Sequence, residues 1–208
     1  MTNTLHRRGT PAGLECDFVI FAITAGGINR EGSADRMKAF SRIVLKHNPA
    51  NFGDMEHGNL FSKDPDQIIA EMTDSSHPRA VFTNIEAISR VLVDLKEADL
   101  GVSINISGLV DDVTACCKET GIAPHSVEQS LGIRGQTEKL PNDRSLELNS
   151  MCGHGMVSFN LIQKVIELVK LGKLTPEEGA RHLTKPCECA AFNPHKARLI
   201  LEEVKKVG

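Results

Sequence analysis

Apolar runs alternate with helix-like patterns through the first half of the chain, and this alternation limits the fold more than any other feature. Residues 17–25 (DFVIFAITA) form a continuous apolar run with β-branched side chains, which predicts a buried strand. Shorter runs at 80–83 and 102–106 have the same character, and each is followed by apolar positions at helical spacing. A further strand is expected at 127–133. We therefore predict the α/β class, with a small parallel sheet and crossover helices.

A parallel sheet also predicts where a ligand binds. Its strand-to-helix junctions meet at the carboxyl edge, which is where ligands usually lie. The junctions here are 24–27, 83–84 and 107–108, and none carries the glycine patterns of nucleotide-binding loops. A phosphate or carboxylate can still bind at the amino terminus of a following helix. The polar segment 51–63 is expected to be a surface or functional loop.

The sequence changes character after Leu140-Pro141, where only helical patterns remain. Residues 157–171 are amphipathic, residues 175–178 form a capping box that begins a second helix, and Asn193-Pro194 begins a third. We expect two cysteine-bearing turns in this part to lie against the carboxyl edge of the sheet. The predicted parts of the chain are a flexible tail (1–13), an α/β domain (14–138) and a three-helix, cysteine-bearing metal-binding segment (139–208).

Composition argues against two classes of partner. The net charge is −3, and the one basic cluster, His6-Arg7-Arg8, lies in the predicted tail, so we expect no nucleic acid. No apolar run is long enough to cross a membrane, and residues 1–11 lack the apolar stretch of a secretory signal. We therefore expect a cytoplasmic protein that does not bind membranes.

Three of the six cysteines lie in turns shaped by glycine or proline, directly before predicted helices. Cys152 stands in the sequence Met-Cys-Gly-His-Gly, and Cys187 and Cys189 flank a single glutamate after a proline. Free backbone N–H groups and the helix dipole favour a thiolate in such turns. The sequence predicts a metal site formed by Cys152, Cys187 and Cys189. His154 is then a fourth ligand, a hydrogen-bond donor to the site, or a catalytic general acid.

The remaining cysteines fit ordinary packing. Cys116 and Cys117 are adjacent in the middle of a predicted helix, where neighbouring side chains point in different directions. Cys16 has no partner nearby in the sequence. We expect all three to behave as small apolar residues.

Two kinds of metal suit the predicted ligands. Zinc would take Cys152, His154, Cys187 and Cys189 as a Cys₃His set, although only one residue separates the members of each pair, where two to four are usual. An iron–sulfur cluster is also held by thiolates, and its larger size relaxes the spacing. On spacing we favour a [4Fe–4S] cluster, with zinc as the alternative.

Short resemblances support a role for these cysteines. Cys-x-His followed by a distant cysteine pair resembles the cluster motif of the hydrogenase-maturation GTPases, and a cysteine followed much later by Cys-x-Cys resembles the A-type iron–sulfur carriers. Both resemblances imply a bound cluster. The sequence Met-Cys-Gly-His-Gly before an apolar helix also resembles the first catalytic motif of the proline racemases, which implies an acid/base role for Cys152 without a cofactor.

Four functions follow as hypotheses. The first is an enzyme whose site-differentiated cluster acts on a small-molecule substrate as a Lewis acid or redox centre, as in a lyase or an oxidoreductase. The second is a carrier or electron-transfer protein that docks on a redox or cluster-transfer partner. The third is a zinc protein, and the fourth is the cofactor-independent enzyme of the racemase type.

Overall fold

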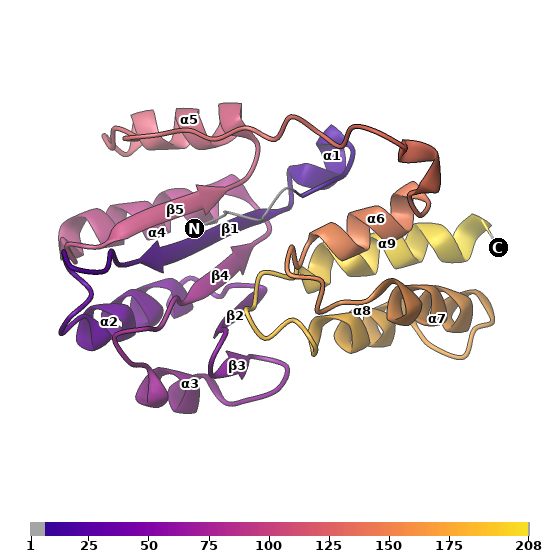
Figure 1. Cartoon of the computed structure of the whole chain (residues 1–208), viewed down its shortest axis with the longest axis horizontal. Coiled ribbons are helices and arrows are strands. Elements are labelled where there is room, and N and C mark those ends of the chain that lie inside the picture. Colours follow the sequence, from indigo (N-terminus) through magenta and orange to yellow (C-terminus); the bar gives the residue numbers. More distant parts are fainter. Residues whose placement is uncertain (1–6, 208) are drawn as a thin grey trace.

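The computed structural model describes residues 7–207, which form two adjacent lobes (Figure 1). The sheet lobe holds the strands, and the helical lobe holds the last helices. Within the described residues the strands are β1 (Phe18–Ile23), β2 (Asn51–Asp54), β3 (Gly58–Asn59), β4 (Arg79–Phe82) and β5 (Ser103–Ser107).

The structure combines a sheet with helices, as the α/β class predicts, but the prediction of parallel strands is wrong. The strand order is β3-β2-β4-β1-β5, and every pairing in it is antiparallel. The chain crosses from β1 to β2 and from β4 to β5 by helices, yet in each case another strand lies between the two. This is a split β-α-β topology. Strand–helix alternation predicts the crossovers but does not say which strands become neighbours.

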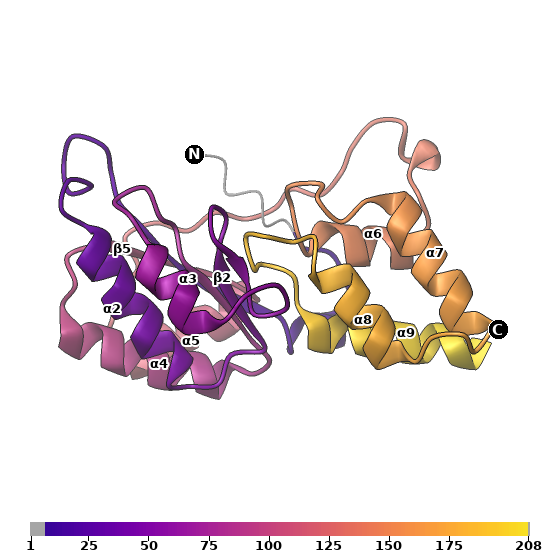
Figure 2. The same ribbon diagram turned by 90° about the horizontal axis from the view of Figure 1, so that it is seen from below.

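One face of the sheet carries the main core. Alternate strand residues, among them Phe18, Ile20 and Phe82, pack against the apolar sides of the helices that cover this face. Figure 2 shows these helices together on the same side of the strands. They are α2 (Ala34–Leu45), α3 (Pro65–Glu71), α4 (Ile85–Ala98) and α5 (Val110–Glu119). We call the opposite side of the sheet, which carries Val19, Phe21 and Val81, the second face.

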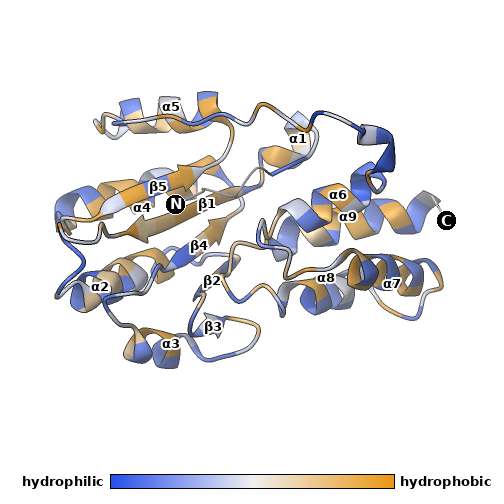
Figure 3. Cartoon of the chain, in the orientation of Figure 1, coloured by the Kyte–Doolittle hydropathy of each residue, from blue (hydrophilic) through white to orange (hydrophobic). Residues whose placement is uncertain are grey.

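The helical lobe has its own core. Four helices pack around a second set of buried apolar residues, and Figure 3 shows their apolar sides turned toward one another. The sequence predicted three helices here and missed the first, which is short and largely polar. The helices are α6 (Asp143–Ser150), α7 (Phe159–Lys170), α8 (Pro176–Thr184) and α9 (Pro194–Val207).

Two local predictions are wrong. Residues 127–133 form no strand, because they run through the extended link between the lobes, where Val127 and Leu131 are exposed. Residues 51–63 are not wholly irregular, because β2 and β3 pair there as a hairpin. The link ends in a short 3₁₀ turn, η1 (Thr137–Lys139).

No helix between residues 7 and 207 is long and apolar enough to cross a membrane.

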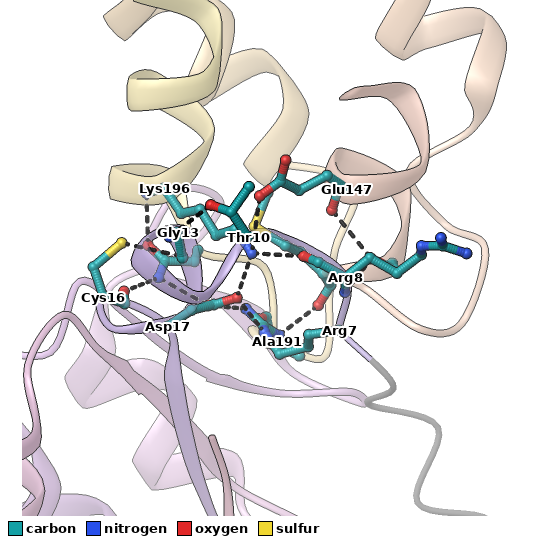
Figure 4. A network of polar contacts seen from close by, with 12 residues as sticks. Arg7, Arg8, Thr10, Gly13, Cys16, Asp17, Glu147, Ala191 and Lys196 are labelled. Carbon is teal, nitrogen blue, oxygen red and sulfur yellow. Dashed lines mark hydrogen bonds and ion pairs between the residues drawn. The ribbon is translucent and has the colours of Figure 1, made fainter. Parts of the chain in front are cut away.

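A buried ionic network joins the two lobes (Figure 4). The Asp17 carboxylate accepts hydrogen bonds from Arg7 Nε (2.7 Å), from Asn193 Nδ2 (3.0 Å) and from Lys196 Nζ (3.1 Å). Asp17 precedes β1, whereas Asn193 and Lys196 belong to the start of α9. Arg7 stands before the short helix α1 (Pro11–Leu14), so a segment from the predicted tail lies between the lobes; residues 1–6 are outside the described part.

Lys196 depends on this network. Its side chain is 1% exposed, and its Nζ also donates to the Arg8 carbonyl at 2.8 Å and pairs with Glu147 at 3.4 Å. A buried ammonium with these partners is tolerated, but one left without its counter-charge is strongly destabilising.

Replacing Asp17 should therefore destabilise the whole chain. We expect Asp17→Asn to lower the free energy of unfolding by about 3–5 kcal/mol, because it leaves Lys196 and Arg7 buried without their carboxylate. Urea titration followed by circular dichroism at 222 nm measures this change. The control is Lys164→Met, which breaks an exposed pair with Glu167 and should change stability by less than about 1 kcal/mol. Equal losses in the two variants would contradict a central role for the network.

The pH dependence of stability should carry the same signature. Burial opposes ionisation of Asp17, but the Arg7 charge and hydrogen bonds, followed by Lys196, hold the pKa of this carboxyl below its usual range. A lowered folded-state pKa stabilises the fold above the unfolded-state value of about 3.9, and the contribution is lost as the pH falls from there through the folded-state pKa. The stability difference between wild type and Asp17→Asn should shrink on going from pH 7 to pH 3, and a constant difference would contradict this assignment.

Candidate metal centre

The structure gathers three cysteine sulfurs at one buried point of the helical lobe. The Sγ atoms of Cys152, Cys187 and Cys189 lie within 4.8 Å of one another, and those of Cys187 and Cys189 are 3.5 Å apart. All three residues are 0% exposed, and all are free thiols. Three thiol sulfurs this close, in a chain without disulfides among its cysteines, form a group that can bind a metal ion.

The turn that carries Cys152 follows α6 and does not directly precede a helix. The Cys152 N–H donates to the Asn149 carbonyl at the end of α6, and α7 begins only at Phe159. The expected help from a helix dipole is therefore wrong for Cys152, because the nearest helix end is a carboxyl end, and it is wrong for Cys187 and Cys189 too, whose turn follows the carboxyl end of α8. Backbone N–H groups of His154 and Met156 donate to the Cys152 sulfur instead.

Positive φ angles let this turn close around the sulfur. Gly153 has φ +73° and Gly155 has φ +76°, which are left-handed conformations that glycine adopts without strain. Asn149 Nδ2 donates to the Val157 carbonyl at 2.7 Å and ties the two ends of the turn together. The glycines that marked this motif in the sequence thus have a conformational role.

The second turn brings two sulfurs to one centre, although only Glu188 separates them. The Cys187 N–H donates to the Thr184 carbonyl at the end of α8, and the Ala190 N–H donates back to Cys187 at 2.9 Å. Ala190 has φ +56°, a left-handed conformation that an L-residue adopts only at some cost. The Ala191 N–H then donates to the Cys189 sulfur.

The sheet lobe holds this second turn in place. Asn59 of β3 is fully buried and its Nδ2 donates to the carbonyls of Cys187 (2.9 Å) and Thr184 (3.3 Å). A Cβ at Gly53 of β2 would lie 2.1 Å from the Gly58 carbonyl oxygen and 3.0 Å from the Ala190 Cβ, so the hairpin itself requires glycine and the turn packs closely on it. The predicted contact between cysteine turns and the sheet thus exists, but it is made on β2 and β3, because an antiparallel sheet has no common carboxyl edge.

Arg7 links both turns, and sequence reasoning missed it. Its Nη1 donates to the Met151 carbonyl and to the Ala191 carbonyl, each at 2.8 Å, while the rest of the guanidinium binds Asp17. Arg7 is therefore a fixed positive charge beside the cysteine group, supported by the joint between the lobes. An arginine among tail residues carries no local signal of such a role.

The three thiols differ in pKa. Hydrogen bonds from Cys187 and Cys189, together with the backbone N–H groups of the first turn, lower the pKa of Cys152. The hydrogen bond that Cys187 gives to Cys152, and then its burial, raise the pKa of Cys187. One thiolate, on Cys152, is therefore favoured before any metal binds, and a cation would displace the remaining thiol protons.

His154 borders the group from one side. Its Nδ1 lies 3.3 Å from the Cys189 sulfur, and its side chain is exposed. The group of ligand atoms that all lie within 4.8 Å of one another consists of the three sulfurs and does not include the His154 imidazole. His154 therefore contacts the site and also faces solvent, as a residue that transfers protons must.

The other cysteines are not part of this group. Cys116 and Cys117 are buried in the core of the sheet lobe, and burial raises the pKa of both thiols. Cys16 donates its thiol hydrogen to the Gly13 carbonyl at 3.5 Å. Asp54, Glu56 and His57 also lie close together on the β2–β3 hairpin, where the His57 imidazole pairs with Asp54 at 2.6 Å.

Comparison of the chain with family models, with curated proteins and with solved structures finds no match. The argument for function therefore rests on the geometry of the site.

Asn59 offers a test of how the sheet lobe supports the centre. We expect Asn59→Ala to weaken metal binding by about 10- to 100-fold, the usual scale for losing a residue that orients a ligand. A competition titration with a chromophoric chelator measures the affinity. Asn160→Ala, on the exposed side of α7, is the matched control and should bind as the wild type does. Unchanged affinity in Asn59→Ala would show that the turn holds its shape without the strand.

Proposed function

We propose that this chain is a metalloenzyme that holds one zinc ion on the thiolates of Cys152, Cys187 and Cys189. His154, beside the ion, serves as the acid or base that exchanges protons with a small-molecule substrate. This proposal reverses the preference for a cluster that the sequence spacing suggested.

The sulfur spacing carries the proposal. Two thiolates on one zinc ion, each about 2.3 Å from the metal at tetrahedral angles, lie about 3.8 Å apart. The Cys187 and Cys189 sulfurs are 3.5 Å apart, and no pair in the group exceeds 4.8 Å. The thiolates of an iron–sulfur cluster bind different irons at separate corners of a larger body, so they stand farther apart than thiolates on a single ion.

The number of close ligands supports an enzyme rather than a structural site. Structural zinc sites are closed by four protein ligands, whereas catalytic sites have three and keep one position for water or substrate. Three sulfurs form the compact set here, and a cavity of about 960 Å³ reaches His154. Such a volume suits a small substrate.

The roles of the residues follow from this arrangement. Zinc on three thiolates supplies Lewis-acid chemistry, as it does in deaminases with three cysteine ligands. His154 is exposed and titratable, and its Nδ1 lies 3.3 Å from the Cys189 sulfur, so we assign to it the proton transfer. Arg7 and the backbone N–H groups balance the negative charge that three thiolates bring into a buried place.

Burial argues against a carrier that passes a metal or cluster to partners. A carrier presents its ligands to an acceptor, but all three cysteines are 0% exposed beneath the two turns. The apolar surroundings and the N–H donors to sulfur are equally suited to a buried iron–sulfur cluster, which is the second candidate.

Metal analysis separates these candidates. Protein purified without oxygen should contain about one zinc per chain and be colourless, and exchange into cobalt should produce intense thiolate-to-metal absorption in the near ultraviolet. The absence of Trp and Tyr keeps this region clear of protein absorption. A brown protein with several irons per chain would contradict the zinc proposal and favour an iron–sulfur cluster.

Cysteine variants test the ligand set. Alanine at Cys152, Cys187 or Cys189 should abolish stoichiometric metal binding, because two thiolates do not complete the set. Cys117→Ala is the matched control, a buried cysteine in the other core, and should keep its metal while losing some stability. Full metal content in Cys152→Ala would contradict the proposed site.

A further inference from the structure

Basic side chains on the second face of the sheet and at its edge keep buried nitrogen atoms without a hydrogen-bond partner within residues 7–207. Their unpartnered atoms are conspicuous because buried polar atoms are almost always hydrogen-bonded. Within the described residues, five buried side-chain nitrogen or oxygen atoms have no hydrogen-bond partner. Four of the five come from the end of β1 and the approach to β4: Thr24 Oγ1, Arg30 Nε, His77 Nδ1 and Arg79 Nη1.

The sheet register shows where these residues lie. Phe21 of β1 lies directly opposite Arg79 of β4, and the ladder continues as the Ala22 N–H donates to the Pro78 carbonyl. His77 therefore lies beside Ile23 where the two strands run out, whereas the alternation of β1 puts Thr24 on the other face. Arg30 belongs to the loop that follows β1. Burial, then the charges of Arg79 and Arg30, lower the pKa of His77, although Asp54 opposes this.

The nearest acids are already engaged. Asp54 accepts the His77 N–H at 2.8 Å and pairs with His57, and the Glu56 carboxylate accepts from Ser75 Oγ at 3.2 Å. The Arg79 guanidinium lies over the Phe21 ring, 5.6 Å from its centroid, and its Nη1 has no hydrogen-bond partner within residues 7–207. Two permanently charged guanidinium groups thus act on His77, and each keeps a buried nitrogen unpaired among the described residues.

Arg79 is connected to the cysteine turns through the neighbouring strand β2. Arg79 lies directly opposite Gly53, and the space above Gly53 is taken by Ala190, the residue after Cys189. Arg79 and His154 also line the same cavity, which runs along the second face between β5 and residues 122–130. Figure 1 shows β4 beginning at the end of the sheet away from the helical lobe, so a substrate bound to Arg79 must extend along the sheet to reach the cysteine turns.

We propose that Arg30, His77 and Arg79 bind the phosphate group of a small phosphorylated substrate whose reactive end reaches the metal centre. Three basic side chains offer donors on several sides, which suits the oxygens of a tetrahedral phosphate better than the two coplanar oxygens of a carboxylate. The link to catalysis rests on the proposed function, but the phosphate site itself does not.

Inorganic phosphate is the probe. Isothermal titration calorimetry at constant ionic strength should show saturable binding of phosphate to the wild-type chain, and weaker binding of succinate. Arg79→Gln and Arg30→Gln should each weaken phosphate binding by about 10- to 100-fold, the effect of losing a charge-assisted contact. Arg134→Gln is the control, because Arg134 is exposed in the link between the lobes and should leave binding unchanged.

A second measurement does not depend on the variants. In the wild type, phosphate should shift the NMR signals of the Arg30 and Arg79 Nε–H groups and leave that of Arg134 in place. Absence of saturable binding, succinate binding as tightly as phosphate, or an equal loss in Arg134→Gln would each overturn the proposal. Metal content is measured on the same samples. Protein that binds phosphate but contains no metal would contradict the proposed function and leave the phosphate site standing. Protein that contains metal but does not bind phosphate would contradict only the phosphate site.

Discussion

The carboxylate of Asp17 is the contact on which the rest of the molecule depends. It lies at the start of β1, and the groups that bind it come from the segment before α1 and from α9 at the far end of the chain. Arg7, fixed by this carboxylate, then reaches both cysteine turns through their carbonyls. The packing of the two lobes and the shape of the cysteine group are therefore coupled, and a change at Asp17 should disturb both.

The three cysteines lie in two turns, and left-handed backbone conformations and local hydrogen bonds fix the shape of these turns. Left-handed backbone at Ala190 and the two glycines around His154 wrap amide groups around the sulfurs, so the negative charge of thiolates is met by fixed dipoles rather than by water. The sheet lobe completes the support through Asn59 and the close packing of Ala190 on Gly53. The three sulfurs are thus held within 4.8 Å of one another.

Sequence patterns predicted the strands β1, β4 and β5, the helices that follow them and the nearness of the three cysteines, because each rests on local periodicity or on turn chemistry. They failed where partners are distant in the sequence. Strand direction depends on which strands pair, and helical crossovers fit the interleaved antiparallel order as well as a parallel one. The roles of Arg7 and Arg79 come from contacts across lobes and strands, so no neighbouring residue signals them.

X-ray absorption at the metal edge tests the central claim most directly, because it reports the metal and its ligands together. The account predicts a zinc edge whose first shell contains three sulfurs at about 2.3 Å and one lighter atom at about 2.0–2.2 Å. Alanine at Cys152 should reduce the sulfur shell in any metal that remains. An iron edge with a second shell of neighbouring irons would contradict the single-ion centre and return the site to an iron–sulfur cluster.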